Sequence, residues 1–129
     1  MKKFFAILVA FAFFAGSCFA ISLSELHIVA DDGTFLGTFE NQYSTNSVYN
    51  QYGDYGSPYS SNSIMNKYGD YGSAYSDKSP FNKYASHAPW IEDRYGNSYG
   101  RLSINRYASG ITNQSYQLAL ELFAWQSSF

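Results

Sequence analysis

Short runs of apolar residues on either side of a polar middle region predict two β-hairpins. The apolar segments Leu26–Val29 and Thr34–Leu36 flank Asp31-Asp32-Gly33, and a similar arrangement begins at Ile91, around the turn Arg94-Tyr95-Gly96-Asn97. Glycine, Asn and Asp tolerate the positive φ angles of tight hairpin turns. Short β-prone runs bounded by such residues are typical of strands.

Two further glycines lie inside the second strand of each predicted hairpin. Gly37 and Gly100 occupy corresponding positions of the two segments. A glycine within a strand indicates a bulge or a close approach of another backbone. We therefore expect a distorted second strand in both hairpins.

Between the hairpins the pattern repeats with a period of sixteen positions. The segment Tyr52-Gly53-Asp54-Tyr55-Gly56-Ser57 returns as Tyr68-Gly69-Asp70-Tyr71-Gly72-Ser73, and a decayed third unit starts at Tyr84. The period also holds for serines, asparagines and apolar positions, which indicates a selected three-dimensional unit rather than disorder. The units are interpreted as running from 36 to 52, 52 to 68 and 68 to 84.

Each unit is expected to contain one single helical turn. Ser47, Ser63 and Ser79 are suited to cap such a turn, and Asn50, Asn66 and Asn82 suit a left-handed exit from it. The repeat glycines are expected to adopt conformations closed to other residues. Aliphatic residues are scarce here, so most repeat tyrosines are expected in the core, since each buried ring removes roughly 150–250 Å² from water.

The last part of the chain predicts a helix. Thr112 or Asn113 is placed to cap a helix from Gln114 to about Gln126, with Leu118, Leu122 and Trp125 on one face and Ala119 and Phe123 beside them. The expected fold is a small, β-rich α+β single domain. Residues 21–110 form the repeat domain with its hairpins, and residues 111–129 form the docked helix.

The first twenty residues predict an export signal. Lys2 and Lys3 precede an apolar run that is short for a membrane span, and small residues follow. Cleavage after Ala20 would release a secreted or periplasmic protein, which is the interpretation we favour. The alternative is that Ala15-Gly16-Ser17-Cys18 is a lipobox, so that acylated Cys18 anchors an envelope lipoprotein in the membrane.

Composition narrows the classes of function. Cys18 is the single cysteine, which excludes disulfides and cysteine metal sites from the mature body. Removing the predicted export signal leaves six basic and ten acidic residues, a net charge of −4. Nucleic-acid binding needs clustered Lys and Arg, so that partner is not expected.

The pattern Tyr-Gly-x-Tyr-Gly-Ser-x-Tyr-Ser-x-x-Ser-[Ile/Val]-x-Asn resembles a short module of exported bacterial proteins whose activity is not established. The resemblance covers roughly residues 28–107. A proline often precedes the repeat tyrosine in that module, whereas Gln51, Lys67 and Lys83 stand there in this chain. The resemblance implies export and a regular fold, and it implies no chemistry.

No metal, cofactor or catalytic centre is expected. Asp54 and Asp70 are single carboxylates one repeat apart and are interpreted as turn residues, because calcium loops gather several oxygens within about a dozen residues. Asp31-Asp32-Gly33 is likewise interpreted as a turn. His27 and His87 have no nucleophile motif around them.

The expected function is therefore a non-enzymatic structural or binding role outside the cytoplasm, with envelope or extracellular polysaccharide, or another surface protein, as partner. The alternative is a carbohydrate-binding accessory module, and a hydrolase is a distant third. A cleft gathering His87, Asp93 and a serine would favour that third class. Tyr55, Tyr71 and Trp90 are the favoured ligand-facing rings, and Trp90 is the best candidate for an exposed one. The wider set of sugar-stacking candidates also includes Tyr52, Tyr59, Tyr68 and Tyr75.

Overall fold

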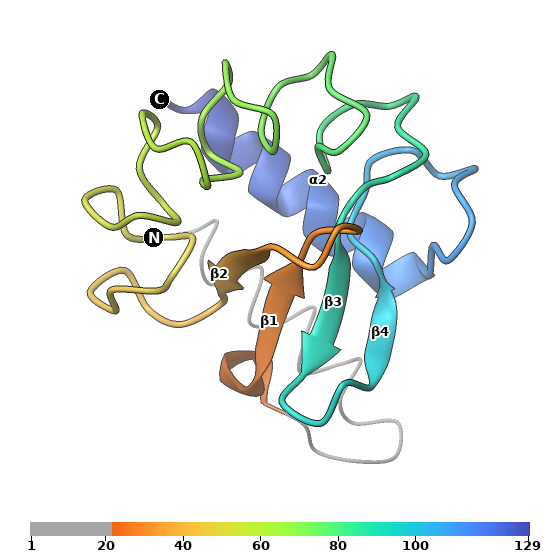
Figure 1. Ribbon diagram of the computed structural model, residues 1–129, viewed down its shortest axis with the longest axis horizontal. Helices are drawn as coiled ribbons and strands as arrows, with labels where there is room; N and C mark the ends of the chain where they lie inside the picture. The colour runs from red at the N-terminus through yellow and green to blue at the C-terminus, as the bar shows by residue number, and fades with distance from the viewer. Residues whose placement is uncertain (1–21) are drawn as a thin grey trace.

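The computed structural model describes residues 22–129, and these form a four-stranded antiparallel sheet, a long turn region and a C-terminal helix (Figure 1). A short 3₁₀ turn, η1 (Leu23–Glu25), leads into β1 (Leu26–Val29). The remaining elements are β2 (Phe35–Thr38), β3 (Trp90–Asp93), β4 (Ser98–Arg101) and α2 (Asn113–Ser127). The predicted export signal and Cys18 lie outside the described residues.

The two predicted hairpins are confirmed, and they join into one sheet of order β2-β1-β3-β4. Ile28 of β1 faces Gly37 of β2 on one side and Ile91 of β3 on the other. Ile28 and Ile91 are both buried, so their pairing places apolar side chains in the core and satisfies the inner edge of each hairpin. The sequence pattern predicted each hairpin but not this union.

The second strand of each hairpin is distorted, as its glycine predicts. The register between β1 and β2 shifts at Ile28/Val29, and that between β3 and β4 shifts between Trp90 and Glu92. Gly37 and Gly100 have φ angles of 114° and 115°, in the region that favours glycine. A Cβ on Gly37 would also lie 2.8 Å from the Cβ of Tyr55, so the turn region approaches the sheet closely here.

Helix α2 begins and ends close to the predicted positions. The Thr112 hydroxyl accepts a hydrogen bond from the Ser115 amide at 3.0 Å, and the Ser115 hydroxyl accepts from the Thr112 amide at 3.0 Å. The most buried side chains of the helix are Ser115, Ala119, Leu122 and Gln126. Leu118, Phe123 and Trp125 are half-buried against the core. The polar Ser115 and Gln126 were not expected on the inner face.

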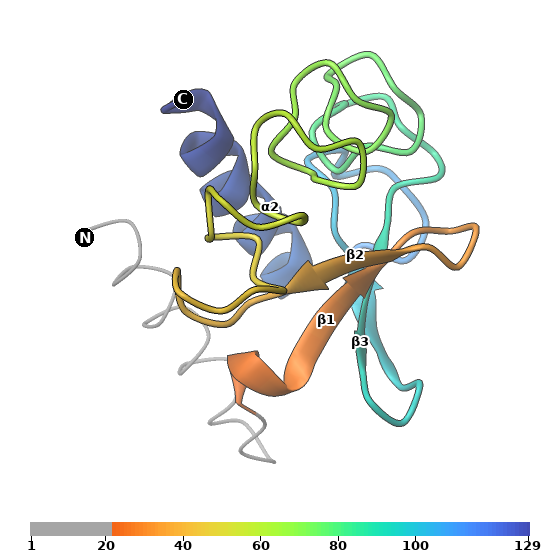
Figure 2. The ribbon, with the colours of Figure 1, turned by 60° about the vertical axis from the view of Figure 1, so that its left-hand side comes forward.

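The segment between β2 and β3, residues 39–89, is a succession of turns that lies along α2 above the sheet (Figures 1 and 2). We call this segment the turn region. From Asn41 to Ser79, a carbonyl accepts from the amide three residues later, and each turn starts where the last one ended. Once in each sixteen-residue period the spacing is four residues instead of three, as where the Ser57 amide donates to the Gly53 carbonyl. Four ordinary steps and one long step bring the chain from Gly53 to Gly69, which accounts for the period. No helical turn is assigned over residues 39–89, so the expected single helical turns are wrong.

Asparagine side chains close these turns. The Nδ2 atoms of Asn50, Asn66 and Asn82 donate to the carbonyl six residues earlier at 3.0 to 3.1 Å. Their Oδ1 atoms accept from the amide two residues later at 3.0 Å. No described residue other than glycine has a positive φ, so the expected left-handed exit is wrong. The amide group satisfies the turn instead.

The inner side of the turn region is formed by small polar and apolar residues. Ser47, Ser63 and Ser79 are fully buried, and each hydroxyl accepts from the amide two residues later at 3.0 Å. Beside them lie the apolar residues Val48, Tyr49, Ile64, Met65 and Phe81.

Helix α2 reaches successive turns along this inner side. Trp125 meets Tyr49 edge-on, and Phe123 stacks on Phe81. The buried Gln126 donates both amide hydrogens, to the carbonyls of Ile64 and Gly72 at 2.8 Å each. These contacts fix the helix against three consecutive parts of the turn region.

The repeat glycines are required by close packing rather than by a left-handed backbone. A Cβ on Gly56 would lie 2.1 Å from the carbonyl oxygen of Asn50, and one on Gly72 would lie 2.2 Å from that of Asn66. Neither residue has a positive φ, so the expected special conformation is wrong for them. Backbone crossing backbone leaves no space for a side chain.

We predict that Gly72→Ala destabilises the protein by more than Gly69→Ala does. The new methyl group at 72 meets backbone oxygens at 2.2 and 2.6 Å, whereas at 69 it meets only the Asn66 side chain at 3.2 Å. Overpacking of the first kind costs about 1–3 kcal/mol. Urea unfolding followed by circular dichroism measures both, and equal stabilities for the two variants would contradict this packing.

Candidate functional site

Eight tyrosine rings project from the surface with 78–96% of their area exposed. Six of them belong to the turn region and follow one another at alternating long and short intervals. The eight are Tyr43, Tyr52, Tyr59, Tyr68, Tyr75, Tyr84, Tyr95 and Tyr107. We call this set the tyrosine array.

Every tyrosine of the array is preceded by the same type of side-chain-to-backbone hydrogen bond. Its backbone amide donates to an oxygen of the side chain two residues earlier, at 2.8 to 3.1 Å. The acceptor is Asn in five cases, Ser in two and Asp in one. Such side-chain turns fix the backbone without help from a strand or helix. The ring is therefore carried on a fixed base while the ring itself touches little.

The expectation that most repeat tyrosines form the core is wrong. The inner side of each turn is occupied by serine and by residues such as Ile64 and Phe81, while α2 closes it from the other side. Because the backbones cross at glycine contacts, little volume remains inside for a phenol ring. Tyr49 is the one tyrosine of the turn region that is buried.

Tyr55 and Tyr71 were the favoured ligand-facing rings, and the structure places both half-buried against the first hairpin. The Tyr55 ring meets Phe35 edge-on with centroids 5.0 Å apart. The Tyr71 hydroxyl donates to Asp32 at 3.2 Å, and it also lies 3.3 Å from the Thr34 hydroxyl. These rings join the turn region to the sheet, and the freely exposed rings belong to other positions of the unit.

Trp90, expected to be the most exposed candidate ring, is half-buried at the start of β3. Its indole N–H donates to Asp31 at 3.0 Å, and the Arg101 guanidinium lies 4.2 Å from a ring centroid. A Cβ on Gly110 would lie 2.5 Å from the indole, so the backbone covers the ring there. These three contacts restrict the access of a ligand to the indole.

A cleft of about 380 Å³ opens between two neighbouring members of the array. Tyr43 and Tyr52 line it, with the buried Tyr49 between them in sequence. The remaining lining residues are Gln42, Asn50 and Gln51. Its lining therefore combines aromatic rings with amides and carries no charged side chain. This cleft was not expected from the sequence, and the tripeptide Asn-Gln-Tyr, which occurs at 41–43 and 50–52, is the signal that could have indicated it.

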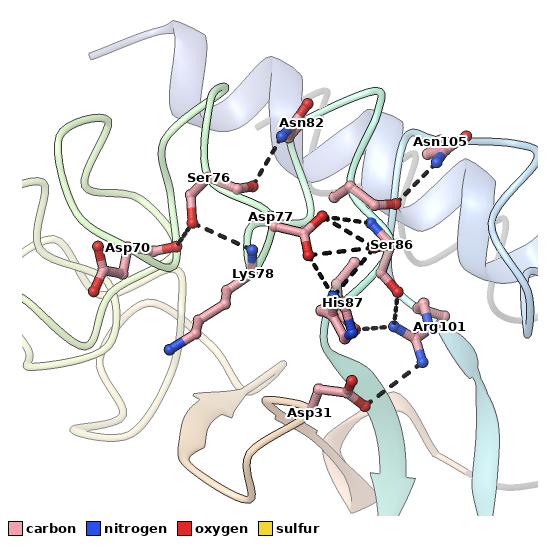
Figure 3. A network of polar contacts seen from close by, with 12 residues as sticks. Asp31, Asp70, Ser76, Asp77, Lys78, Asn82, Ser86, His87, Arg101 and Asn105 are labelled. Carbon is pink, nitrogen blue, oxygen red and sulfur yellow. Dashed lines mark hydrogen bonds and ion pairs between the residues drawn. The ribbon is translucent and has the colours of Figure 1, made fainter.

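Asp77, Ser86 and His87 form a polar cluster on the surface (Figure 3). The Ser86 hydroxyl lies 3.1 Å from His87 Nδ1, and an Asp77 carboxylate oxygen contacts the same nitrogen. A serine hydrolase needs the acid and the nucleophile on opposite ring nitrogens. Here both meet Nδ1 and the hydroxyl also contacts Asp77, so no relay exists. Asp93 is held separately in the β3–β4 turn by Asn97 and Tyr99.

Arg101 fixes the backbone behind this cluster. Its Nη1 donates to the carbonyls of Ser86 and Ala88 at 2.8 and 3.1 Å, and its Nη2 lies 3.6 Å from Asp31. The side chain is buried and lies over Trp90. The network thus ties the last turns to β4 and to the β1–β2 turn, which is a structural role.

The other acidic residues do not gather into a metal site. Within residues 22–129 no group of three or more His, Cys, Asp or Glu side chains is placed to hold a metal ion. Asp54 and Asp70, considered as calcium ligands, are both exposed on separate turns. No helix in this part of the chain is long and apolar enough to cross a membrane.

Comparisons with family models, with curated proteins and with solved structures found no significant match.

The pKa of Asp77 provides a test of the polar cluster. Hydrogen bonds from the Ser86 amide and from His87 hold this pKa below its ordinary value of 3.8. The unfolded chain then binds the proton more readily, so the stabilisation is present above about pH 4 and is lost as the pH falls through the folded pKa. Asp77→Asn should therefore lower the melting temperature at pH 5, with the difference from wild type shrinking towards pH 2.5.

Circular dichroism melts of both proteins between pH 5 and pH 2.5 measure this difference. Asp32 and Asp93 also have lowered pKa values, but both are present in the two proteins and cancel in the comparison. A difference that stays constant across this range would contradict the role given to Asp77.

Proposed function

We propose that this chain is an exported, non-enzymatic binding protein whose tyrosine array is its contact surface. Each repeat unit then acts as a module that supplies two outward rings, one after a serine or asparagine and one after the next asparagine. The partner lies in the cell envelope or outside the cell, either as polysaccharide or as another surface protein.

The proposal rests on one observation: the exposed rings are attached to backbone that hydrogen bonds already hold in place. An aromatic ring that is almost fully exposed adds little to folding stability, because it leaves little area removed from water. Tyrosine is also enriched in binding interfaces relative to the rest of the protein surface. Each ring of the array also stands on a backbone already held by a side-chain hydrogen bond, which lowers the ordering cost of binding.

Export is part of the same proposal and rests on residues 1–20. A mature net charge of −4 gives the protein no general attraction for nucleic acid. The polar cluster of Asp77, Ser86 and His87 lacks the geometry of a relay, which favours a binding role over a hydrolytic one.

We predict that mass spectrometry of the mature protein from producing cells will find Ile21 at the N-terminus. The small residues up to Ala20 suit signal peptidase. A mature chain that begins with a diacylglyceryl-modified Cys18, and whose processing stops with globomycin, would instead show an envelope lipoprotein. An unprocessed Met1 would contradict export by a cleaved signal.

Replacing the six array tyrosines of the turn region by serine should abolish binding without unfolding the protein. These are Tyr43, Tyr52, Tyr59, Tyr68, Tyr75 and Tyr84. These rings are 78–96% exposed, so removing them changes the buried apolar area very little. The variant should therefore melt near the wild-type temperature but no longer sediment with envelopes or extracellular matrix prepared from producing cells.

The matched control is Tyr55→Ser with Tyr71→Ser, which removes repeat tyrosines that contact the sheet. This pair should lower stability, because the Phe35 contact and the Asp32 hydrogen bond are lost, and should leave sedimentation of the folded protein unchanged. A wild-type protein that sediments with neither fraction would overturn the proposed function.

A further inference from the structure

We propose that the cleft between Tyr43 and Tyr52 is a binding subsite for a neutral saccharide. This inference rests on the proposed function and deepens it, because it names a ligand class for one part of the array. The cleft is lined by two turns that begin with the same tripeptide, Asn41-Gln42-Tyr43 and Asn50-Gln51-Tyr52, and two further turns lie between them in sequence.

The two tyrosines supply flat surfaces. Tyr43 is 82% exposed and Tyr52 is 96% exposed, yet both line the same hollow. An aromatic face is electron-rich and attracts the slightly positive C–H groups on the apolar face of a pyranose ring. Their amides are fixed by Asn41 and Asn50 at 2.9 and 3.0 Å, so the base of each ring is in place before a ligand arrives.

The amides supply the polar contacts. Gln42 and Gln51 are exposed side chains on the cleft wall, and a primary amide both donates and accepts hydrogen bonds. Sugar hydroxyls also do both, so the two groups match. Asn50 is already committed to the Ser44 carbonyl and the Tyr52 amide, and it holds the wall in shape.

The absence of charge points to a neutral ligand. None of the six lining residues is acidic or basic. An anionic polymer such as polygalacturonate would find no cation in the cleft and would meet a protein of net negative charge. A volume of about 380 Å³ lies in the range of roughly 300–1,000 Å³ that is usual for small-molecule sites.

The repeat supplies a matched control within the same chain. One period later the same pair of turns carries Tyr59 and Tyr68, but Pro58 and Lys67 replace the two glutamines. Tyr59 and Tyr68 are as exposed as the rings of the cleft. Both places therefore carry a pair of exposed rings, but only the first also carries two glutamine side chains.

The experiment is isothermal titration of the mature protein with neutral hexasaccharides of glucose, xylose, mannose and N-acetylglucosamine. At least one should bind, and Tyr43→Ala with Tyr52→Ala should weaken it by about tenfold or more. Gln42→Leu with Gln51→Leu should weaken the same sugar while keeping the rings. Tyr59→Ala with Tyr68→Ala should change its affinity less than twofold.

Each further outcome has a defined meaning. If both tyrosine pairs matter equally, or the glutamine variant binds like wild type, the cleft is not the subsite. If no neutral hexasaccharide binds while the protein still sediments with envelopes or matrix, the saccharide inference is overturned and the proposed function stands. Tighter binding of polygalacturonate than of every neutral sugar also overturns it.

Discussion

The structure depends on one constraint: the chain between β2 and β3 must satisfy its backbone hydrogen bonds without forming a helix or a β-strand. Buried amide and carbonyl groups must find partners. Here short turns provide one set of bonds, and Ser and Asn side chains provide the other. Gln126 completes the set from α2, since it satisfies two carbonyls that face inward. The turn positions of this segment are therefore occupied by residues with short polar side chains, mainly Ser and Asn.

This requirement reverses the ordinary placement of side chains. Serines are fully buried because their hydroxyls bind the backbone, and glycines are needed where one turn crosses another. The remaining interior is filled by residues such as Ile64, Met65 and Phe81 together with one face of α2. Rings at the outer positions have no interior to enter. Tyr55 and Tyr71 are intermediate, since they reach the neighbouring hairpin.

Local signals in the sequence predicted the elements well, whereas non-local packing escaped them. The two hairpins were indicated by their turn glycines, Gly33 and Gly96, and the distortion of their second strands by Gly37 and Gly100. The start of the helix was indicated by Thr112, and the regular middle segment by the sixteen-residue period. The pairing of Ile28 with Ile91 was not predictable, because any buried strand edge would have served. The direction of the tyrosines was misjudged because composition suggested a shortage of apolar residues, and α2 and the buried serines fill the space instead. One signal was available within the turn region: its exposed rings follow Asn-x or Ser-x with Gln, Lys, Ala or Pro in the middle, whereas buried Tyr49 follows Ser47 and Val48.

Exposed rings at regular intervals favour self-association unless something opposes it. The mature net charge of −4 opposes it weakly. The outer rings of the turn region also stand on separate turns of the chain, seven or nine residues apart. Where two such rings flank amides, as at Tyr43 and Tyr52, the surface gains directional hydrogen bonding in addition to stacking. The repeat therefore supplies the rings, and local departures from the repeat supply specificity.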